Sequence, residues 1–107
     1  MIYEIRVYEA AEGKADAMKS RFKNEAATRF AGHGIELLGV FESATDASRL
    51  TYLTRFKSEE DRSKAWAALG ADPQWRAVKA ATEVDGPLLK QQTVQVVSPA
   101  MAGLLLG

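Results

Sequence analysis

The chain is 107 residues long, a length that fits one domain and leaves no room for a second. Hydrophobic residues make up 47% of it and charged residues 26%, a balance that can bury a core and excludes a disordered chain. Basic and acidic residues each number 14, so the zero net charge gives no electrostatic footprint of a nucleic-acid binder. The absence of cysteine excludes disulfides, thiolate nucleophiles and cysteine-ligated metal centres.

The first predicted elements are a strand over residues 2–8 and an amphipathic helix after it. In the strand, apolar and polar side chains alternate, which places Glu4, Arg6 and Tyr8 on one face. After a polar turn, apolar residues recur at spacings of three and four over residues 15–30, the pattern of a helix of about four turns. The glycines on either side of His33 are typical of the end of a helix.

Three further strands are predicted. The apolar run over residues 35–42 and the alternating run over residues 49–56 are joined by a short polar segment, which indicates a hairpin with a longer loop. Gly86-Pro87 breaks the chain before a last strand over residues 89–97.

A second helical region lies between the third and fourth strands. Ser58 is followed by three carboxylates, which favour a helix N-terminus because they accept hydrogen bonds from free N–H groups and complement the helix dipole. The helix is expected to stop near Gly70 and to restart at Asp72 and Pro73. Aspartate suits the cap position and proline the first helical turn.

The resulting order is strand, helix, strand, strand, helix pair, strand. This order predicts an α+β domain of the ferredoxin-like βαββαβ type, with a four-stranded antiparallel sheet and helices on one face. The other face is left open, and an open face in a small domain is either solvated or covered by a partner. The domain is expected over residues 1–97. Residues 98–107 form an apolar tail that either packs on its own sheet or a partner or is disordered.

Several short motifs follow one another along the chain. They are Tyr3-Glu4-Ile5-Arg6-Val7-Tyr8, Gly13-Lys14, His33-Gly34 with Leu38-Gly39-Val40, Leu53-Thr54-Arg55-Phe56-Lys57-Ser58 leading to Arg62, and Ala71-Asp72-Pro73-Gln74-Trp75. In this order and spacing they resemble the landmarks of NIPSNAP domains, over about residues 2 to 97. The third strand departs from the family's usual pattern, since Tyr52 and Thr54 stand where that pattern has histidine and tryptophan.

The resemblance implies the dimeric α+β barrel superfamily, in which two open sheets close against each other and each subunit encloses a pocket. Relatives in that superfamily include cofactor-independent antibiotic-biosynthesis monooxygenases, haem-degrading enzymes and stress-responsive barrel proteins. NIPSNAP domains themselves bring no established reaction to this chain. The resemblance therefore implies a homodimer or a higher oligomer, and no particular substrate.

The polar set on the first strand is one candidate site. Glu4, Arg6 and Tyr8 share one strand face, which we expect to point away from the helices. In a closed pocket, a carboxylate beside a guanidinium and a phenol can bind a planar acidic ligand or move a proton. The same side chains can form a structural row of ion pairs under a dimer partner, so both interpretations stay open.

His33 is the only histidine, and imidazole titrates in the range that suits general acid or base chemistry near neutral pH. It can equally be a helix C-terminal residue whose ring satisfies a free carbonyl. His33 and Tyr8 are the candidate catalytic residues. No metal site is predicted, because Glu36 and the scattered carboxylates do not have the spacing of a metal-ligand set.

The third predicted strand has two mixed faces. One carries Tyr52 and the other carries Arg55, and alternation alone does not tell which face lines a pocket. Together with Glu4 and Arg6, these two residues are the candidate substrate-binding residues.

Other classes of function are disfavoured. Gly32-His33-Gly34 lacks the flanking strand and helix of a phosphate-binding loop, and no serine lies in a nucleophile elbow. The third strand lacks the glycine and aromatic spacing of RNA-recognition domains, and no apolar run approaches the length that spans a bilayer. Trp66 and Trp75 have the spacing of core residues. We therefore expect a cytoplasmic protein with no nucleic-acid or membrane partner.

The sequence favours a dimeric barrel that binds a small, partly aromatic or acidic metabolite in a pocket between sheet and helices, without a cofactor. It leaves two roles open: a cofactor-independent monooxygenase or isomerase, and a non-catalytic homodimeric interaction or ligand-carrier module. An enzyme should have a pocket with a group that titrates near neutral pH. A structural dimer should fill the same space with paired side chains.

Overall fold

The computed structural model describes residues 1–101 of the chain. Its elements are β1 (Ile2–Ala10), α1 (Ala15–Arg21), a π-helical turn η1 (Phe22–Ala26), α2 (Ala27–Phe30), a 3₁₀ turn η2 (Ala31–His33), β2 (Glu36–Glu42), β3 (Arg49–Phe56), α3 (Glu59–Ala71), α4 (Pro73–Thr82) and β4 (Leu89–Val97). The third and fourth strands have the predicted bounds, and β1 extends past Tyr8 to Ala10. Most of the predicted tail, residues 102–107, lies outside the described residues.

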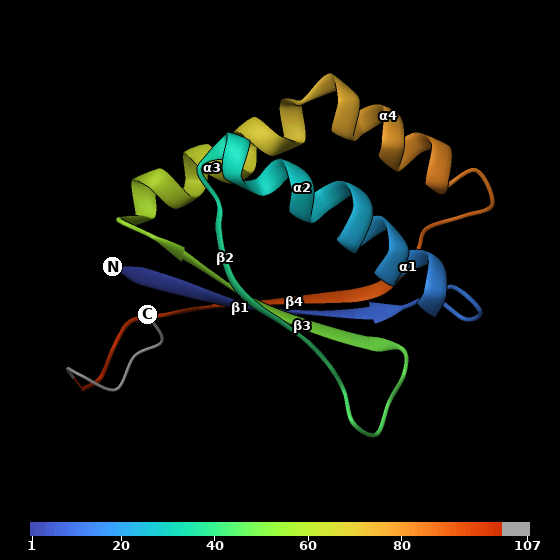
Figure 1. Ribbon diagram of the computed structural model, residues 1–107, viewed down its shortest axis with the longest axis horizontal. Helices are drawn as coiled ribbons and strands as arrows, with labels where there is room; N and C mark the ends of the chain where they lie inside the picture. Colours follow the sequence, from blue (N-terminus) through green and yellow to red (C-terminus); the bar gives the residue numbers. More distant parts are fainter. Residues whose placement is uncertain (102–107) are drawn as a thin grey trace.

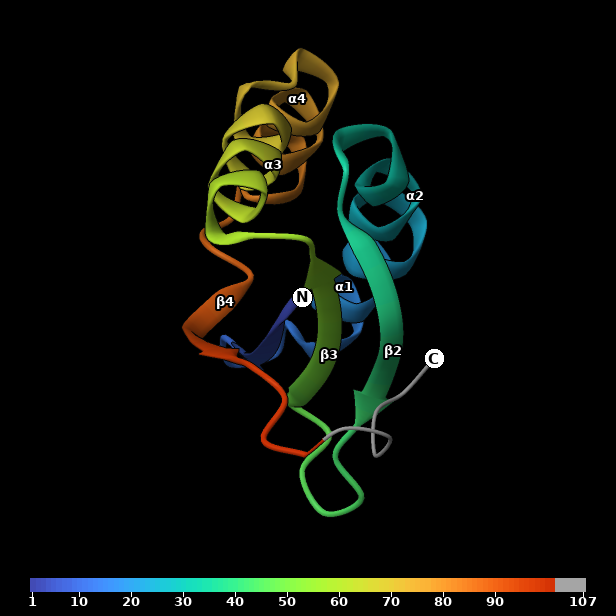
Figure 2. The same ribbon diagram turned by 90° about the vertical axis from the view of Figure 1, so that its left-hand side faces the viewer.

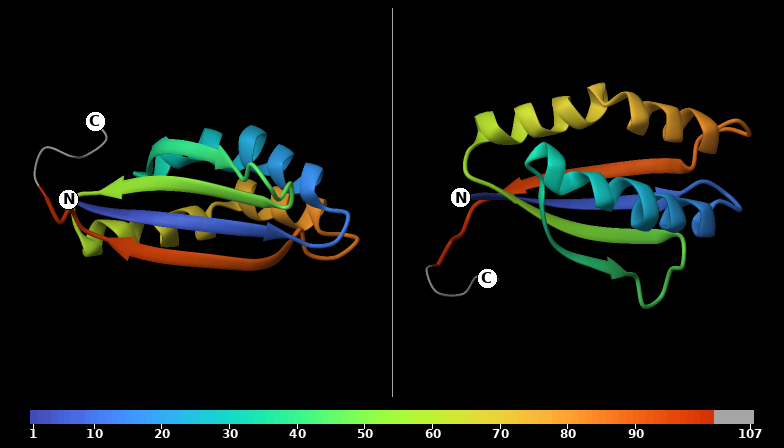
Figure 3. Two further views of the ribbon diagram at one scale, coloured as in Figure 1. Left: turned by 90° about the horizontal axis from the view of Figure 1, so that it is seen from below. Right: turned by 45° about the horizontal axis from the view of Figure 1, so that its top comes forward.

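The four strands form one antiparallel sheet in the order β2-β3-β1-β4. The helices lie in two groups on one side of this sheet, with α1 and α2 in one group and α3 and α4 in the other (Figures 1 and 2). Seen from below in Figure 3, the sheet lies in front of the helices and its second face is bare. The predicted ferredoxin-like α+β arrangement is therefore confirmed.

The first helical region runs from α1 through η1 and α2 to η2. Its buried apolar residues recur every fourth position at Met18, Phe22, Ala26 and Phe30. A spacing of four drifts around an α-helix of 3.6 residues per turn, and a wider π turn compensates for this drift. The turn η1 therefore keeps these side chains in line over the sheet. Gly34 ends the region with a left-handed backbone at φ 79°, a conformation that glycine adopts without strain.

The second helical region begins and restarts at the predicted caps. The Ser58 hydroxyl accepts a hydrogen bond from the Asp61 N–H at 3.1 Å at the start of α3. One carboxylate oxygen of Asp72 accepts from the Gln74 N–H at 2.8 Å at the start of α4, where Pro73 fills the first helical position. The break between the two helices is thus fixed by local side-chain chemistry.

The polar side of β1 faces the helices. Glu4 is completely buried there, opposite the equally buried Thr54 of β3, and Arg6 is opposite the buried Tyr52. The expectation that Glu4, Arg6 and Tyr8 point away from the helices is therefore wrong. Alternation divides the strand into two faces, but which face is covered depends on partners that other elements bring to it.

The open face of the sheet carries the apolar residues of β1. Ile5 and Val7 alternate with the buried polar set, and Ile5 is opposite Leu53 of β3. All three are only partly buried within one chain. Phe41 on β2 is opposite Thr51 and is exposed. This face thus has a small apolar centre, with the ion pair of Glu9 and Arg49 at one end of it.

Candidate ligand-binding site

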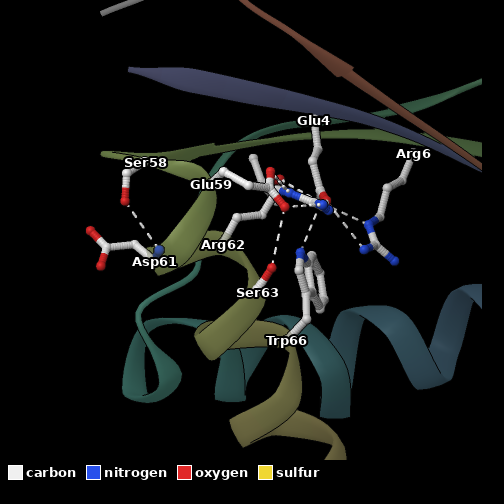
Figure 4. Close-up of polar contacts among 9 residues, drawn as sticks. Glu4, Arg6, Ser58, Glu59, Asp61, Arg62, Ser63 and Trp66 are labelled. Carbon is white, nitrogen blue, oxygen red and sulfur yellow. Dashed lines mark hydrogen bonds and ion pairs between the residues drawn. The ribbon is translucent and has the colours of Figure 1, made fainter.

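The buried carboxylate of Glu4 is the centre of a hydrogen-bond network between β1 and α3 (Figure 4). One of its oxygens accepts from the Arg6 Nε–H and from the Trp66 indole N–H, both at 2.9 Å. The other oxygen accepts from Arg62 at 2.6 Å. The Thr54 hydroxyl adds a longer contact at 3.4 Å. Donors from three elements therefore satisfy this carboxylate.

The network keeps Glu4 ionised. Burial by itself works to raise the pKa of Glu4, but the hydrogen bonds from Arg6 and Arg62 outweigh it and hold the pKa below its ordinary value. Glu4 is not in the wall of the four best-defined cavities of residues 1–101, so we assign it the role of holding Arg6 in place. The structural ion-pair interpretation thus fits Glu4, on the covered face of the sheet.

Arg6 connects this network to a cavity between the sheet and the helices. Its guanidinium carbon lies 3.8 Å from the centre of the Trp66 ring, a cation–π contact. Both side chains line the cavity, whose volume is about 190 Å³. Since a salt bridge and a stacked ring restrain Arg6 from two sides, its orientation is set before any ligand enters.

The cavity combines aromatic walls with cationic groups. The aromatic side chains are Tyr8, Phe22, Trp66 and Trp75, and the cationic groups are Arg6, Arg21 and Lys79. Its lining among residues 1–101 includes neither a carboxylate nor the histidine. This composition suits a small ligand with an apolar body and a negative charge.

Tyr8 and Tyr52 form a hydrogen-bonded pair with their hydroxyl oxygens 2.7 Å apart. Tyr52 is fully buried and does not line the cavity, whereas Tyr8 does. Burial raises the pKa of both phenols, so both stay protonated near neutral pH. The pair contributes polar hydrogens, not a base, to the covered face.

Arg21 closes the cavity at the side of α1. One of its guanidinium nitrogens donates to the Glu83 carboxylate at 2.6 Å and to the Thr82 hydroxyl at 3.1 Å. Its guanidinium carbon also lies 5.6 Å from the centre of the Trp75 ring. These contacts tie α1 to the end of α4 on the far side of the cavity from the sheet.

His33 and Arg55 belong to a different region. They line a second, open cavity of about 600 Å³ at the end of the sheet where β3 leads into α3. The His33 Nε2 lies 2.8 Å from the Asp72 carboxylate, so its partner is a carboxylate and not the predicted carbonyl. The structure does not bring His33 together with Tyr8. The candidate residues therefore divide, with Arg6 and Tyr8 at the first cavity and His33 and Arg55 at the second.

The sequence did not single out several residues of the first site. Arg21, Lys79 and Arg62 lie on helices, where charged side chains are usually exposed, and nothing in the local sequence marks Arg21 as buried. Trp66 was expected in the core. It packs there with Phe30, and it also donates to Glu4. An indole N–H beside a buried carboxylate is a signal that only the fold reveals.

The sequence profile of the NIPSNAP family matches residues 3–102, nearly the whole chain. The chain belongs to the NIPSNAP family. No curated protein sequence matches this NIPSNAP chain significantly.

Solved structures agree with that assignment. A NIPSNAP family protein with unknown function from Agrobacterium tumefaciens has 28% identity and a TM-score of 0.81, over 98% of this NIPSNAP chain and 93% of that one. A second NIPSNAP protein from the same organism has 22% identity and a TM-score of 0.82, over 97% of both chains. A putative antibiotic biosynthesis monooxygenase from Nitrosomonas europaea has 16% identity and a TM-score of 0.66, over 94% of this chain and 100% of that one. At 22% and 16% identity the last two likenesses show the fold alone.

Helices that could span a bilayer are absent from residues 1–101.

Proposed function

We propose that this NIPSNAP chain binds a small acidic metabolite with an aromatic or apolar body in the cavity between its sheet and its helices. The observation that carries the proposal is the composition of the cavity wall. Aromatic rings line it together with Arg6, Arg21 and Lys79, and no carboxylate from the described residues does. A carboxylate ligand would find charge-assisted donors there and apolar surface for the rest of its body.

The tyrosine pair can donate one hydrogen bond to an oxygen atom of the ligand. Two hydroxyl groups carry two hydrogens, and one hydrogen is used in the bond between Tyr8 and Tyr52. If the enclosed Tyr52 donates to Tyr8, the Tyr8 hydrogen is left for a partner in the cavity that Tyr8 lines. A ligand oxygen is the partner that this arrangement suits best, because a buried hydroxyl without an acceptor costs free energy.

Binding is better supported than a cofactor-independent oxygenase or isomerase reaction. Such reactions need a group that takes a proton from the substrate, with a pKa near the working pH. Within residues 1–101, the titratable groups in the lining of this cavity are one tyrosine hydroxyl, that of Tyr8, and three cations. The only histidine lines the other cavity. We therefore favour the ligand-carrier role.

Tryptophan fluorescence tests the proposal, because the chain has two tryptophans and both line the cavity. The probes are benzoate and benzamide, which share one ring and differ in charge. We expect a saturable fluorescence change with benzoate and binding of benzamide that is about tenfold weaker, a difference of about 1.4 kcal/mol. Equal binding of the two probes, or no saturable change with either, would contradict an acidic ligand.

We also propose that the chain is a homodimer joined through the open faces of two sheets. Ile5, Val7 and Leu53 give that face an apolar centre, and Phe41 extends it along β2. A face of this kind is an association surface in soluble proteins. A second copy of the same face can cover it, because a two-fold symmetric dimer buries the same patch on both copies. The dimer and the ligand would then occupy opposite sides of one sheet.

A further inference from the structure

The larger cavity lies at the opposite end of the sheet from the start of β4. Its wall is formed where η2 turns into β2, where β3 ends and along one side of α3, and its volume is about 600 Å³. Gly32 and Gly34 both line it, and a Cβ added at either position would meet nothing within 4 Å. The missing side chains therefore leave this space open beside His33.

His33 is held at the edge of this cavity by a fixed carboxylate. Its Nε2 lies 2.8 Å from one oxygen of Asp72, whose other oxygen accepts backbone N–H groups at the start of α4. The hydrogen bond from His33 and those N–H groups hold the pKa of Asp72 below its ordinary value. An ionised Asp72 favours a hydrogen on Nε2, and it leaves the Nδ1 atom as the second functional atom of the ring.

Basic side chains complete the wall. They are Arg55 from β3, Lys57 from the turn after it and Lys64 from α3. The acidic residues in the wall are Glu36 and Asp61, and Glu36 is engaged by Arg55 at 2.6 Å.

Two of these cations differ in their partners. Lys64 pairs with Glu60 at 2.9 Å, one turn earlier on α3. Lys57 has no ion pair within residues 1–101. Lys57 is therefore the cation of this wall that is most available to an external anion.

We propose that this cavity is a second binding site, for a small oxyanion of the sulfate, phosphate or carboxylate type, and that His33 makes its affinity depend on pH. The protonated ring donates one N–H to Asp72 and the other to the oxyanion, while Lys57 and Lys64 supply charge. When the ring loses its proton, the donor to the oxyanion is lost. The site is separate from the cavity between sheet and helices and does not rest on the function proposed for it.

The sign of the pH dependence follows from the groups that face His33. Asp72 at the N-cap of α4, Asp61 on α3 and Glu36 on β2 carry carboxylates, a type of group that is ionised at neutral pH. Lysine and arginine titrate well above it. Histidine is the side-chain type that changes charge between about pH 6 and about pH 8, and Met1 adds an α-amino group, a type that loses its proton toward the upper end of that range, to the same wall. Both changes remove positive charge, so oxyanion binding should weaken as the pH rises.

NMR of the imidazole ring tests the proposal directly, because His33 is the only histidine and gives the only ring signals of this type. Sodium sulfate is the probe because it does not titrate in this range, and sodium chloride of equal ionic strength is the control. We expect sulfate to move the His33 signals saturably and to bind several-fold more tightly at about pH 6 than at about pH 8. A parallel titration with acetate separates carboxylate ligands from tetrahedral ones.

Three variants sharpen the test. Lys57→Gln should weaken sulfate binding roughly threefold, as expected for loss of one exposed charge. Ala68→Phe places a ring on the exposed side of α3 that lines the cavity and should abolish binding. Lys90→Gln removes an exposed charge on β4 that lines neither cavity and should leave sulfate binding unchanged. Sulfate shifts that chloride reproduces, that persist in Ala68→Phe or that do not depend on pH would overturn the proposal.

Discussion

The two faces of β1 are built on opposite principles. Under the helices the strand presents Glu4, which is fully buried and accepts hydrogen bonds from α3, and Arg6, which is largely buried and donates to Glu4. On the open side it presents Ile5 and Val7, which are only partly covered within one chain. A buried charge is tolerated where donors surround it, and an apolar side chain stays in contact with water where nothing covers it. The polar groups of the covered face are therefore satisfied within one chain, and the open face leaves apolar side chains in contact with water.

The largest expected effect comes from the covered face. Glu4→Gln removes the charge that Arg6 and Arg62 share. Arg62 keeps its ion pair with Glu59, but the largely buried Arg6 loses its counter-ion. Breaking a buried ion pair in this way costs about 3 kcal/mol or more. Urea unfolding of the variant measures the loss.

Glu36→Gln is the matched control for this variant. Glu36 also accepts two hydrogen bonds from one arginine, Arg55, but it lies on the open side with a side chain that is 51% exposed. Its loss should cost less than about 1 kcal/mol, because exposed pairs are screened by water. Equal losses in the two variants would mean that burial does not distinguish the two faces.

Acid should weaken the covered face through the same residue. The pKa of Glu4 is lower in the folded chain than in the unfolded one, where glutamate titrates at about 4.3. Its contribution to stability is therefore complete above that value and is lost as the pH falls through the folded pKa. Thermal unfolding between about pH 6 and about pH 3 should show a steeper fall for the wild type than for Glu4→Gln. If both proteins lost thermal stability equally as the pH fell, the loss would have to come from other carboxylates.

The open face should respond to charge by losing its partner. Leu53→Glu places a carboxylate in the centre of the apolar surface, opposite Ile5 on the neighbouring strand. In a symmetric dimer two such charges would meet, and we expect the dissociation constant to rise by a factor of about 100 or more. Sedimentation velocity measures the change, and the fold should survive because this position is not in the core. A monomeric wild type at micromolar concentration would contradict the proposed dimer.

The tyrosine pair gives a smaller, graded effect on ligand binding. Tyr8→Phe removes the hydroxyl that lines the cavity and should weaken benzoate binding about tenfold, the value of one charge-assisted hydrogen bond. Tyr52→Phe removes only the group behind it and should weaken binding about threefold at most. Tryptophan fluorescence titration compares the two variants. A larger loss in Tyr52→Phe would reverse the assigned roles.

Local sequence signals were enough for the elements and their order. The hydroxyl of Ser58 and the carboxylate of Asp72 cap their helices as predicted, because capping depends on neighbours within one turn. The strand bounds followed from alternation and turn residues. The π turn at η1 was not predicted. A spacing of four between apolar residues needs a wider turn only when the helix packs against the sheet and these side chains must stay in line.

The site was less accessible from sequence. Alternation grouped Glu4, Arg6 and Tyr8 correctly but did not reveal which face is covered, because Arg62 and Trp66 lie about 60 positions later in the chain. His33 was grouped with Tyr8 as a candidate catalytic residue because both side-chain types suit acid–base chemistry. The type of side chain does not tell where a residue lies, and the fold places Tyr8 and His33 at two different cavities.

We propose that the two faces of the sheet have separate roles, with the ligand on the covered side and a second copy on the open side. The most direct test is a benzoate titration of Leu53→Glu, followed by the fluorescence of the two tryptophans in the cavity. We predict a monomer that binds benzoate within about twofold of the wild-type affinity, since nothing on the open face lines that cavity. A monomer that has lost benzoate binding would contradict the claim and make the open face part of the binding site.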